Sequence, residues 1–225
     1  MGLDLYAKLE PLIPFPEEMK KLYTAYIKKL EKQQPKSILD IGCGGGNFME
    51  LATEKGFSIE GIDLSAAQVA MAASRGFKAE AKDLADVSGT YDAAVAVFDV
   101  LNYMDETALA EFLQNAKRIL APEGRFYADI NTLFAFEEIA QGALLLHGEG
   151  QHGSMEAYFD GESLHTELRL FTQDGNCFRM EEDMIIQHYH ALEVIRKLSP
   201  FKTMKVDNLA LYSKKPDKFL ITFSD

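Results

Sequence analysis

Hydrophobic residues follow two different periods along most of this chain. Short apolar runs such as Ser37–Ile41 alternate with segments whose apolar positions recur every three or four residues, such as 109–120. The first pattern predicts strands and the second predicts amphipathic helices. The run Asp92–Phe98 is almost wholly apolar, which is typical of a parallel strand that is buried on both faces. Repeated β-α units with short connections therefore predict a doubly wound, mainly parallel sheet.

Seven segments are expected to form this main sheet. They are Ser37–Ile41, Phe57–Ile62, Phe77–Ala81, Asp92–Phe98, Arg125–Ile130, Lys202–Ala210 and Lys218–Ser224. Before the first of them, Leu3–Gln34 carries an apolar stripe at helical spacing, and Pro14 and Pro16 place the start of its main helix.

The pattern changes after Asn131, at the end of the fifth predicted strand. Three runs there lack a helical period, namely Ser154–Asp160, Leu164–Phe171 and Cys177–His190. Aspartate-glycine pairs follow the first two runs, and such pairs between extended segments indicate hairpins. We therefore expect a three-stranded antiparallel insert. The chain then divides into an N-terminal helical segment (residues 1–35), a core (36–140 and 191–225) and the insert (141–190).

A glycine-dense loop separates the first predicted strand from the first helix of the core. It reads Asp40-Ile41-Gly42-Cys43-Gly44-Gly45-Gly46-Asn47, with the spacing D-x-G-x-G-x-G. Glycine tolerates positive φ and lets bare backbone approach a ligand at the start of a helix. A dinucleotide fingerprint would need a third glycine where Asn47 stands, so the loop disfavours an NAD or flavin site.

This loop and two later motifs resemble the cofactor motifs of the class I S-adenosylmethionine (SAM)-dependent methyltransferases. The later motifs are Gly61-Ile62-Asp63-Leu64-Ser65 and Lys82-Asp83-Leu84, and the resemblance covers about residues 36–130. It implies a Rossmann-like fold with a seven-stranded sheet and SAM as the cofactor. The segment Asp99-Val100-Leu101-Asn102 follows the fourth strand where other relatives carry an Asn-Pro-Pro-Tyr type of segment. It therefore resembles the small-molecule branch of the family.

The resemblance also implies a set of cofactor-binding residues. Asp63 stands at a strand end about twenty residues past the loop, where an acid can accept hydrogen bonds from ribose hydroxyls. Asp83 and the backbone of Leu84 are expected beside the adenine. The full expected set is Tyr6, Asp40, Gly42, Cys43, Gly44, Gly46, Asp63, Leu64, Asp83, Leu84, Phe98 and Asp99.

The acceptor side is predicted from the residues after the fourth strand and from the insert. In-line transfer from a sulfonium needs orientation of two reactants, and no metal. Asp99, Asn102 and Tyr103 are candidates for catalysis, although none is identified as a general base. The residues expected near the substrate are Asn102, Tyr103, His152 and Tyr158, and the insert is expected to act as a lid on the acceptor side. His188 and His190 lack a third matching ligand, so no metal site is expected.

Composition and charge narrow the list of partners. The formal net charge of −12 argues against a nucleic-acid partner, since phosphate binding needs clustered lysine and arginine. The basic pairs Lys20-Lys21, Lys28-Lys29 and Lys214-Lys215 are interpreted as scattered solvated positions. The longest apolar runs are too short to cross a membrane, and the N-terminus does not resemble a signal peptide. We therefore expect a cytoplasmic protein that does not bind membranes.

The favoured function is methyl transfer from SAM to a small-molecule acceptor. Two other functions stay open at this point: a non-catalytic SAM-binding protein and, less favoured because of Asn47, an NAD(P)-dependent oxidoreductase. The sequence does not identify the acceptor or whether O, N, S or C receives the methyl group. It leaves the oligomeric state open, with a homodimer among the options.

Overall fold

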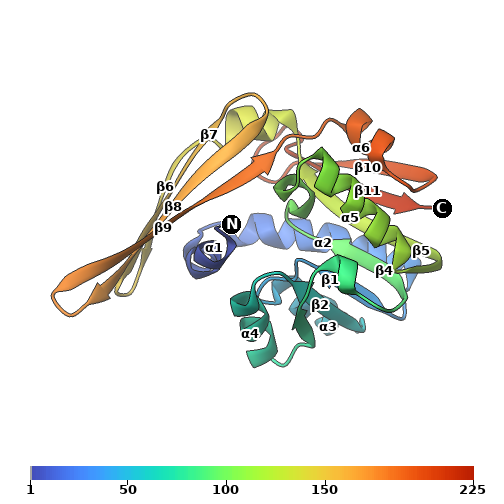
Figure 1. Cartoon of the computed structure of the whole chain (residues 1–225), viewed down its shortest axis with the longest axis horizontal. Coiled ribbons are helices and arrows are strands. Elements are labelled where there is room, and N and C mark those ends of the chain that lie inside the picture. The colour runs from blue at the N-terminus through green and yellow to red at the C-terminus, as the bar shows by residue number, and fades with distance from the viewer. Residues whose placement is uncertain (1) are drawn as a thin grey trace.

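The core of the molecule is a seven-stranded sheet with helices on both faces (Figure 1). This computed structural model describes residues 2–225, and Met1 lies outside the described residues. The strand order is β10-β11-β5-β4-β1-β2-β3. Strand β11 is antiparallel to both of its neighbours, and the remaining pairs are parallel. The predicted doubly wound seven-stranded sheet is confirmed.

The strands of this sheet agree closely with the predicted segments. Their bounds are β1 Ile38–Ile41, β2 Ile59–Asp63, β3 Ala79–Ala81, β4 Tyr91–Ala96, β5 Leu120–Asn131, β10 Thr203–Leu209 and β11 Lys218–Ser224. The largest difference is in β5, which begins at Leu120 because the segment Pro122-Glu123-Gly124 is contained within the strand as an irregularity. Glu123 has a φ of 67° there.

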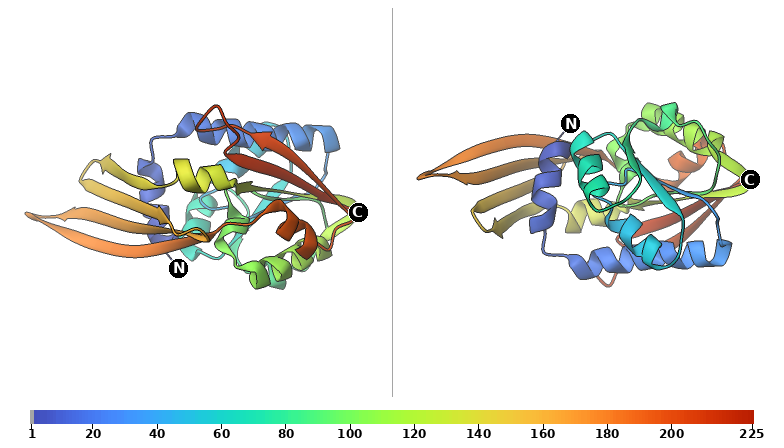
Figure 2. Two further views of the ribbon diagram at one scale, coloured as in Figure 1. Left: turned by 90° about the horizontal axis from the view of Figure 1, so that it is seen from above. Right: turned by 90° about the horizontal axis from the view of Figure 1, so that it is seen from below.

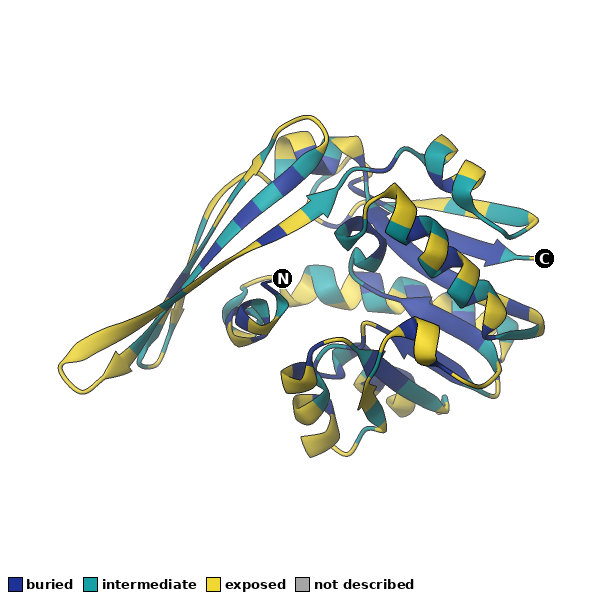
Figure 3. Cartoon of the chain, viewed as in Figure 1, coloured by how far each residue is buried: buried dark blue, intermediate teal, exposed yellow. Residues whose placement is uncertain are grey.

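Two hydrophobic layers enclose the sheet. Helices α2 (Pro16–Gln33) and α3 (Asn47–Glu54) cover one face, and α5 (Glu106–Arg118) and α6 (Leu192–Leu198) cover the other. Strand β4 contributes Ala93 and Val95 to the first layer, and Ala94 and Ala96 to the second. Figure 3 shows this central region as the most deeply buried part of the fold. A parallel strand covered on both faces has no solvated side, which is why its sequence lacks polar alternation.

Shorter helical segments complete the connections. They are α4 (Ala66–Ser74) beside β2 and β3, the turns η2 (Leu84–Asp86) and η3 (Val100–Tyr103), and the π-helical turn η4 (Ala135–Ile139). Within residues 2–225, no helix has the combination of length and apolar character that a membrane span requires.

The insert is a separate antiparallel sheet that projects from the core (Figures 1 and 2). It has four strands rather than the predicted three: β6 Gly142–Gly148, β7 Gln151–Phe159, β8 Ser163–Asp174 and β9 Cys177–His188. The prediction omitted β6, whose short apolar run Leu144-Leu145-Leu146 lies between Gly142 and Gly148. Its hairpin closes through Glu149-Gly150, where the glycine adopts a φ of 66°.

The N-terminal segment is divided into two helices. Helix α1 (Leu3–Leu9) and the short turn η1 (Glu10–Leu12) precede α2, and Pro14 and Pro16 mark the boundary as predicted. Helix α1 lies between the insert and the core (Figure 2). Its buried leucines share a hydrophobic cluster with the insert residues Leu146, Leu168, Leu170 and Ile185.

This packing predicts that the insert and α1 are stabilised together. Leu168→Ala should lower the free energy of unfolding by about 2–5 kcal/mol, because it leaves a cavity at a fully buried position. Leu145→Ala is the matched control: Leu145 lies on the same sheet with 68% of its surface exposed, and the change should stay within about 0.5 kcal/mol. Urea denaturation measures the free energy of unfolding of both variants. An equal loss in the two variants would contradict the burial of Leu168 against α1.

Candidate functional site

A cavity of about 680 Å³ opens at the carboxyl ends of strands β1, β2 and β4. This is the edge at which open α/β sheets bind their ligands, and the volume is within the usual range for small-molecule sites. The lining side chains come from segments within residues 3–23, 40–48, 62–68, 82–85, 97–104 and 108–115, together with Tyr212. The N-terminal segment therefore forms one wall, and the core loops form the others.

The glycine loop between β1 and α3 forms the floor of this cavity. Gly42 has a φ of 74°, and a Cβ there would lie 3.0 Å from a methyl carbon of Val100. Gly46 has a φ of 84°, and a Cβ would lie 2.8 Å from the ring of Phe77. Both positions therefore require glycine for the conformation and for the space. Gly42 lines the cavity, whereas Gly46 faces Phe77 and does not.

Asp63 is fixed at the cavity wall by the backbone around it. One carboxylate oxygen accepts the N–H of Gly44 at 2.9 Å, and the other accepts the N–H of Ser65 at 2.8 Å. Ser65 caps α4 by accepting the N–H of Gln68. The Gln68 side chain donates to Glu10. Each Asp63 oxygen retains a lone pair, so the carboxylate can still accept a hydrogen bond from a ligand.

Asp40 is the most unusual group in the cavity lining. It is 1% exposed, and neither carboxylate oxygen has a hydrogen-bond partner among residues 2–225. Burial raises the pKa of Asp40 to about 8, and the nearby charge of Asp63 adds to this shift. A buried carboxyl group without a donor is costly. Asp40 therefore fits a ligand that supplies donors at this wall, as the hydroxyl and ammonium groups of SAM do.

Eleven of the twelve expected cofactor residues line this one cavity, the exception being Gly46. Asp83 accepts the N–H of Ala85 at 2.8 Å and begins η2, which orients the backbone of Leu84. Leu64 lies at the rim and is 63% exposed. The sequence motifs thus converge in space, and the residues present fit SAM.

Of the acceptor-side candidates, the structure places Asp99 and Tyr103 in the cavity lining but not Asn102. Asn102 is fully buried and both ends of its amide are used: Nδ2 donates to the carbonyl of His188 at 2.8 Å, and Oδ1 accepts the N–H of Asn131 at 3.0 Å. It therefore ties η3 to the ends of β5 and β9. This role was not anticipated, because it depends on two contacts that are distant in sequence.

The insert does not contribute side chains to the cavity lining. His152 lies on β7 beside His147 and Phe178. Tyr158 is 54% exposed and stacks on His165 with the ring centroids 4.8 Å apart. Neither residue is brought to the cavity, because α1 occupies the space between the insert and the core loops.

Several lining residues were missed by the sequence motifs because they come from the N-terminal segment and the loop after β10. Tyr23 and Tyr212 are among these missed residues, and they join the predicted Tyr6 and Tyr103 in the lining. Burial raises the pKa of Tyr103 and of Tyr212 to about 12, so both phenols stay protonated at neutral pH. Glu10 accepts hydrogen bonds from Asn47 at 3.3 Å and Gln68 at 3.4 Å, and burial raises its pKa. Nothing in the local sequence around Glu10 indicated these tertiary contacts.

A buried polar cluster lies behind the end of β4, and the sequence motifs missed it too. The carboxylate of Asp129 on β5 accepts four hydrogen bonds, from Tyr26, the N–H groups of Phe98 and Asp99, and Lys218. Burial raises the pKa of Asp129 and lowers that of Lys218. An aspartate within the otherwise apolar run Phe126–Ile130 was the one sequence signal for this cluster.

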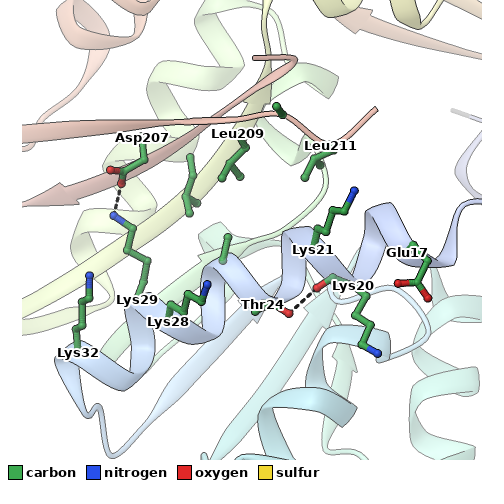
Figure 4. Close-up of a pocket in the computed structure, with 13 residues that line it drawn as sticks. Glu17, Lys20, Lys21, Thr24, Lys28, Lys29, Lys32, Asp207, Leu209 and Leu211 are labelled. Atoms are coloured by element: carbon green, nitrogen blue, oxygen red, sulfur yellow. Dashed lines mark hydrogen bonds and ion pairs between the residues drawn. The ribbon is translucent and has the colours of Figure 1, made fainter. Parts of the chain in front are cut away.

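A second hollow, of about 630 Å³, lies between α2 and β10 (Figure 4). Five lysines of α2 line it: Lys20, Lys21, Lys28, Lys29 and Lys32. Two of the three basic pairs therefore lie on one helix face and are not scattered. Lys29 pairs with Asp207, and the other four lysines are exposed to solvent. No buried polar atom without a partner among the described residues lines this hollow, so it lacks the feature that marks the first cavity.

Comparison with known proteins agrees with the geometry. A family model described as a methyltransferase domain matches residues 15–171. The chain belongs to this family, which confirms the resemblance to the SAM-dependent methyltransferases and SAM as the cofactor.

Two curated relatives illustrate the range of sequence similarity. The "Putative methyltransferase YqeM" of Bacillus subtilis (strain 168) is 29% identical over 128 residues, which is 52% of each chain. A "Putative methyltransferase" of Geobacillus sp. (strain WCH70) is 27% identical over 173 residues, or 69% of each chain. The match to the Bacillus protein thus spans about half of the length of that relative.

Solved structures share the fold over nearly the whole chain. A SAM-dependent methyltransferase from Clostridium acetobutylicum ATCC 824 has a TM-score of 0.76 at 19% identity, covering 99% of this chain and 96% of that chain. The sugar N-methyltransferase KedS8 from Streptoalloteichus sp. ATCC 53650 has a TM-score of 0.75 at 17% identity, covering 99% and 93%. At these identities the likeness establishes the fold alone.

The burial of Asp40 predicts a pH dependence of the ligand-free protein. Its pKa rises from 3.8 to about 8 on folding, so between these values unfolding releases a proton that the folded state retains. Stability contributed by this group is therefore lost as the pH rises through that window, by up to about 1.4 kcal/mol per pH unit. Asp40→Asn has no such ionisation and should gain stability relative to the wild type from about pH 5 to pH 8.

Chemical denaturation of both proteins at several pH values measures this difference. If the free energy of unfolding of the two proteins depended on pH in the same way, the raised pKa of Asp40 would be wrong.

Proposed function

We propose that this protein transfers the methyl group of SAM to a small-molecule acceptor by in-line displacement. The observation that carries the proposal is the buried carboxyl group of Asp40, which lacks a donor among residues 2–225 and lines the same cavity as the glycine loop and Asp63. A cavity built in this way favours a polar, donor-rich ligand over an empty structural turn.

Each part of the cavity has a proposed role toward the cofactor. Asp63 would accept hydrogen bonds from the ribose hydroxyls, and Asp83 with the backbone of Leu84 would contact the adenine. The bare backbone at Gly42 and Gly44 would allow close approach of the remaining part of the cofactor. When bound, SAM supplies a methyl group that is already activated on a positively charged sulfur. The main task of the protein is then to hold the two reactants in line.

A small acceptor is supported by how the cavity is enclosed. Helix α1, the start of α2 and four tyrosines form a wall across it, which leaves room for a compact molecule beside the cofactor. The structurally similar protein KedS8 is described as a sugar N-methyltransferase, and an acceptor of that size would suit this cavity. We propose that the insert acts on the acceptor side indirectly, by holding α1 through the cluster around Leu168.

The cofactor assignment predicts selective stabilisation by ligands. SAM or S-adenosylhomocysteine should raise the melting temperature, and NAD should not. Asp63→Asn should weaken binding by about 1.5–3 kcal/mol, because the ribose hydroxyls lose a charged acceptor. The control is Glu60→Gln on the same strand; Glu60 pairs with Lys78 and lies outside the cavity lining. Titration calorimetry measures the Kd of SAM for both variants. Stabilisation by NAD alone would refute the assignment.

The acceptor class is tested with a metabolite panel and methyl-labelled SAM. We expect a labelled small-molecule product, and Tyr103→Ala should reduce its formation because Tyr103 lines the cavity. His152→Ala and Tyr158→Ala should leave it nearly unchanged, because their side chains lie outside the lining. Tight SAM binding with no product from any panel compound would instead favour a non-catalytic SAM-binding protein.

A further inference from the structure

The turn at the end of β4 has a backbone conformation that needs support. Phe98 and Asp99 have φ values of 66° and 59°, so two successive side-chain-bearing residues adopt the left-handed region. This conformation is unfavourable for an aromatic residue, and it persists only where the surroundings enforce it. Both residues line the cofactor cavity. The strained turn is therefore part of the site.

Asp129 enforces this conformation. Its carboxylate accepts the N–H of Phe98 at 2.9 Å and the N–H of Asp99 at 3.1 Å. Successive N–H groups directed at one anion form a favourable anion-binding arrangement. Tyr26 donates to the same carboxylate at 2.6 Å and Lys218 at 3.0 Å. With four donors, the buried carboxylate is satisfied and holds the turn in place.

Lys218 holds the side chain of Asp99 in position. Its ammonium group donates to Asp99 Oδ1, to Asp129 at 3.0 Å and to Asn131 at 3.0 Å, which uses all three of its N–H groups. Lys218 is 1% exposed and does not line the cavity, so it cannot contact the reactants itself.

Asp99 keeps one carboxylate oxygen free. No residue within the described part of the chain donates to its Oδ2, and its side chain is 17% exposed and lines the cavity. One oxygen is thus anchored, and the other is available to a ligand.

We propose that Asp99 Oδ2 accepts a hydrogen bond from the N–H or O–H group of the methyl acceptor, and that Lys218 is the positioning residue that holds Asp99 for this contact. This inference rests on the proposed methyl transfer and deepens it by naming the acceptor class, an amine or a hydroxyl. The lone pair of the acceptor atom forms the new bond to carbon, and the carbon–sulfur electron pair stays on sulfur. The acceptor proton passes to Asp99 Oδ2 and then to solvent.

A double-mutant cycle tests the proposal with an acceptor found in the panel. Asp99→Asn keeps the shape of the side chain, and Lys218→Met removes the ammonium group. Each should lower kcat/KM for the acceptor by about 10- to 100-fold, the value of one charge-assisted hydrogen bond, with a smaller change in the Kd of SAM. Because Lys218 acts largely through Asp99, the loss in the double variant should be smaller than the product of the two single losses.

Two results of this cycle would overturn the proposal. One is a loss of kcat/KM in the double variant that equals the product of the two single-variant losses. The other is a loss of SAM affinity as large as the loss of kcat/KM, since that would mean a purely structural role. Lys29→Met is the matched control, because Lys29 pairs with Asp207 on the surface and should leave both quantities unchanged.

A further measurement does not depend on the acceptor or on any Lys218 variant. In the complex with S-adenosylhomocysteine, nitrogen NMR should detect the Lys218 side chain as a protected ammonium group whose resonance shifts in Asp99→Asn. An unshifted resonance would overturn the Lys218–Asp99 coupling even if the panel yields no product. If the resonance shifts but the panel yields only thiol or carbon acceptors, the Lys218–Asp99 coupling is supported and the proposed acceptor class is wrong.

Discussion

The buried carboxylate of Asp129 joins the parts of the molecule on which the site depends. It lies on β5 and bonds to Tyr26 of α2, to the turn after β4 and to Lys218 of β11. Removing a carboxylate from water is expensive unless donors replace the lost solvation, and four donors do so here. The position of α2, the strained turn at Phe98 and the orientation of Asp99 therefore depend on one another. Asp129 thus holds the part of the cavity wall that Phe98 and Asp99 form.

Another part of the cavity wall depends on packing between helix α1 and the insert. Helix α1 has only seven residues, too few to be stable alone in water. It is held by leucines that pack on the insert and by contacts with α4. Helix α1 therefore depends on the insert and on α4 for its stability.

Burial of Asp40 in the cavity lining lowers the stability of the ligand-free protein. Asp40 is buried without a donor among residues 2–225, and its ionised form is penalised in the ligand-free protein. In contrast, the buried carboxylate of Asp129 is fully satisfied by the protein. Both aspartates are almost fully buried, yet of the two only Asp129 has hydrogen-bond partners for its carboxylate among residues 2–225. Hydrogen-bond partners, rather than burial alone, distinguish the two carboxyl groups.

The sequence by itself determined the sheet, the glycine loop and the cofactor side of the site. These features are local: strand and helix periods act over a few residues, and the carboxyl ends of successive parallel strands meet at one edge, so the motifs at Asp40, Asp63 and Asp83 had to converge. Only the tertiary structure decided the roles of Asn102, Glu10 and Lys218, because each depends on partners between 29 and 119 residues away. It also placed α1, rather than the insert, in the lining of the cavity. Strand alternation specifies which face of a sheet is buried, but it does not specify what covers that face.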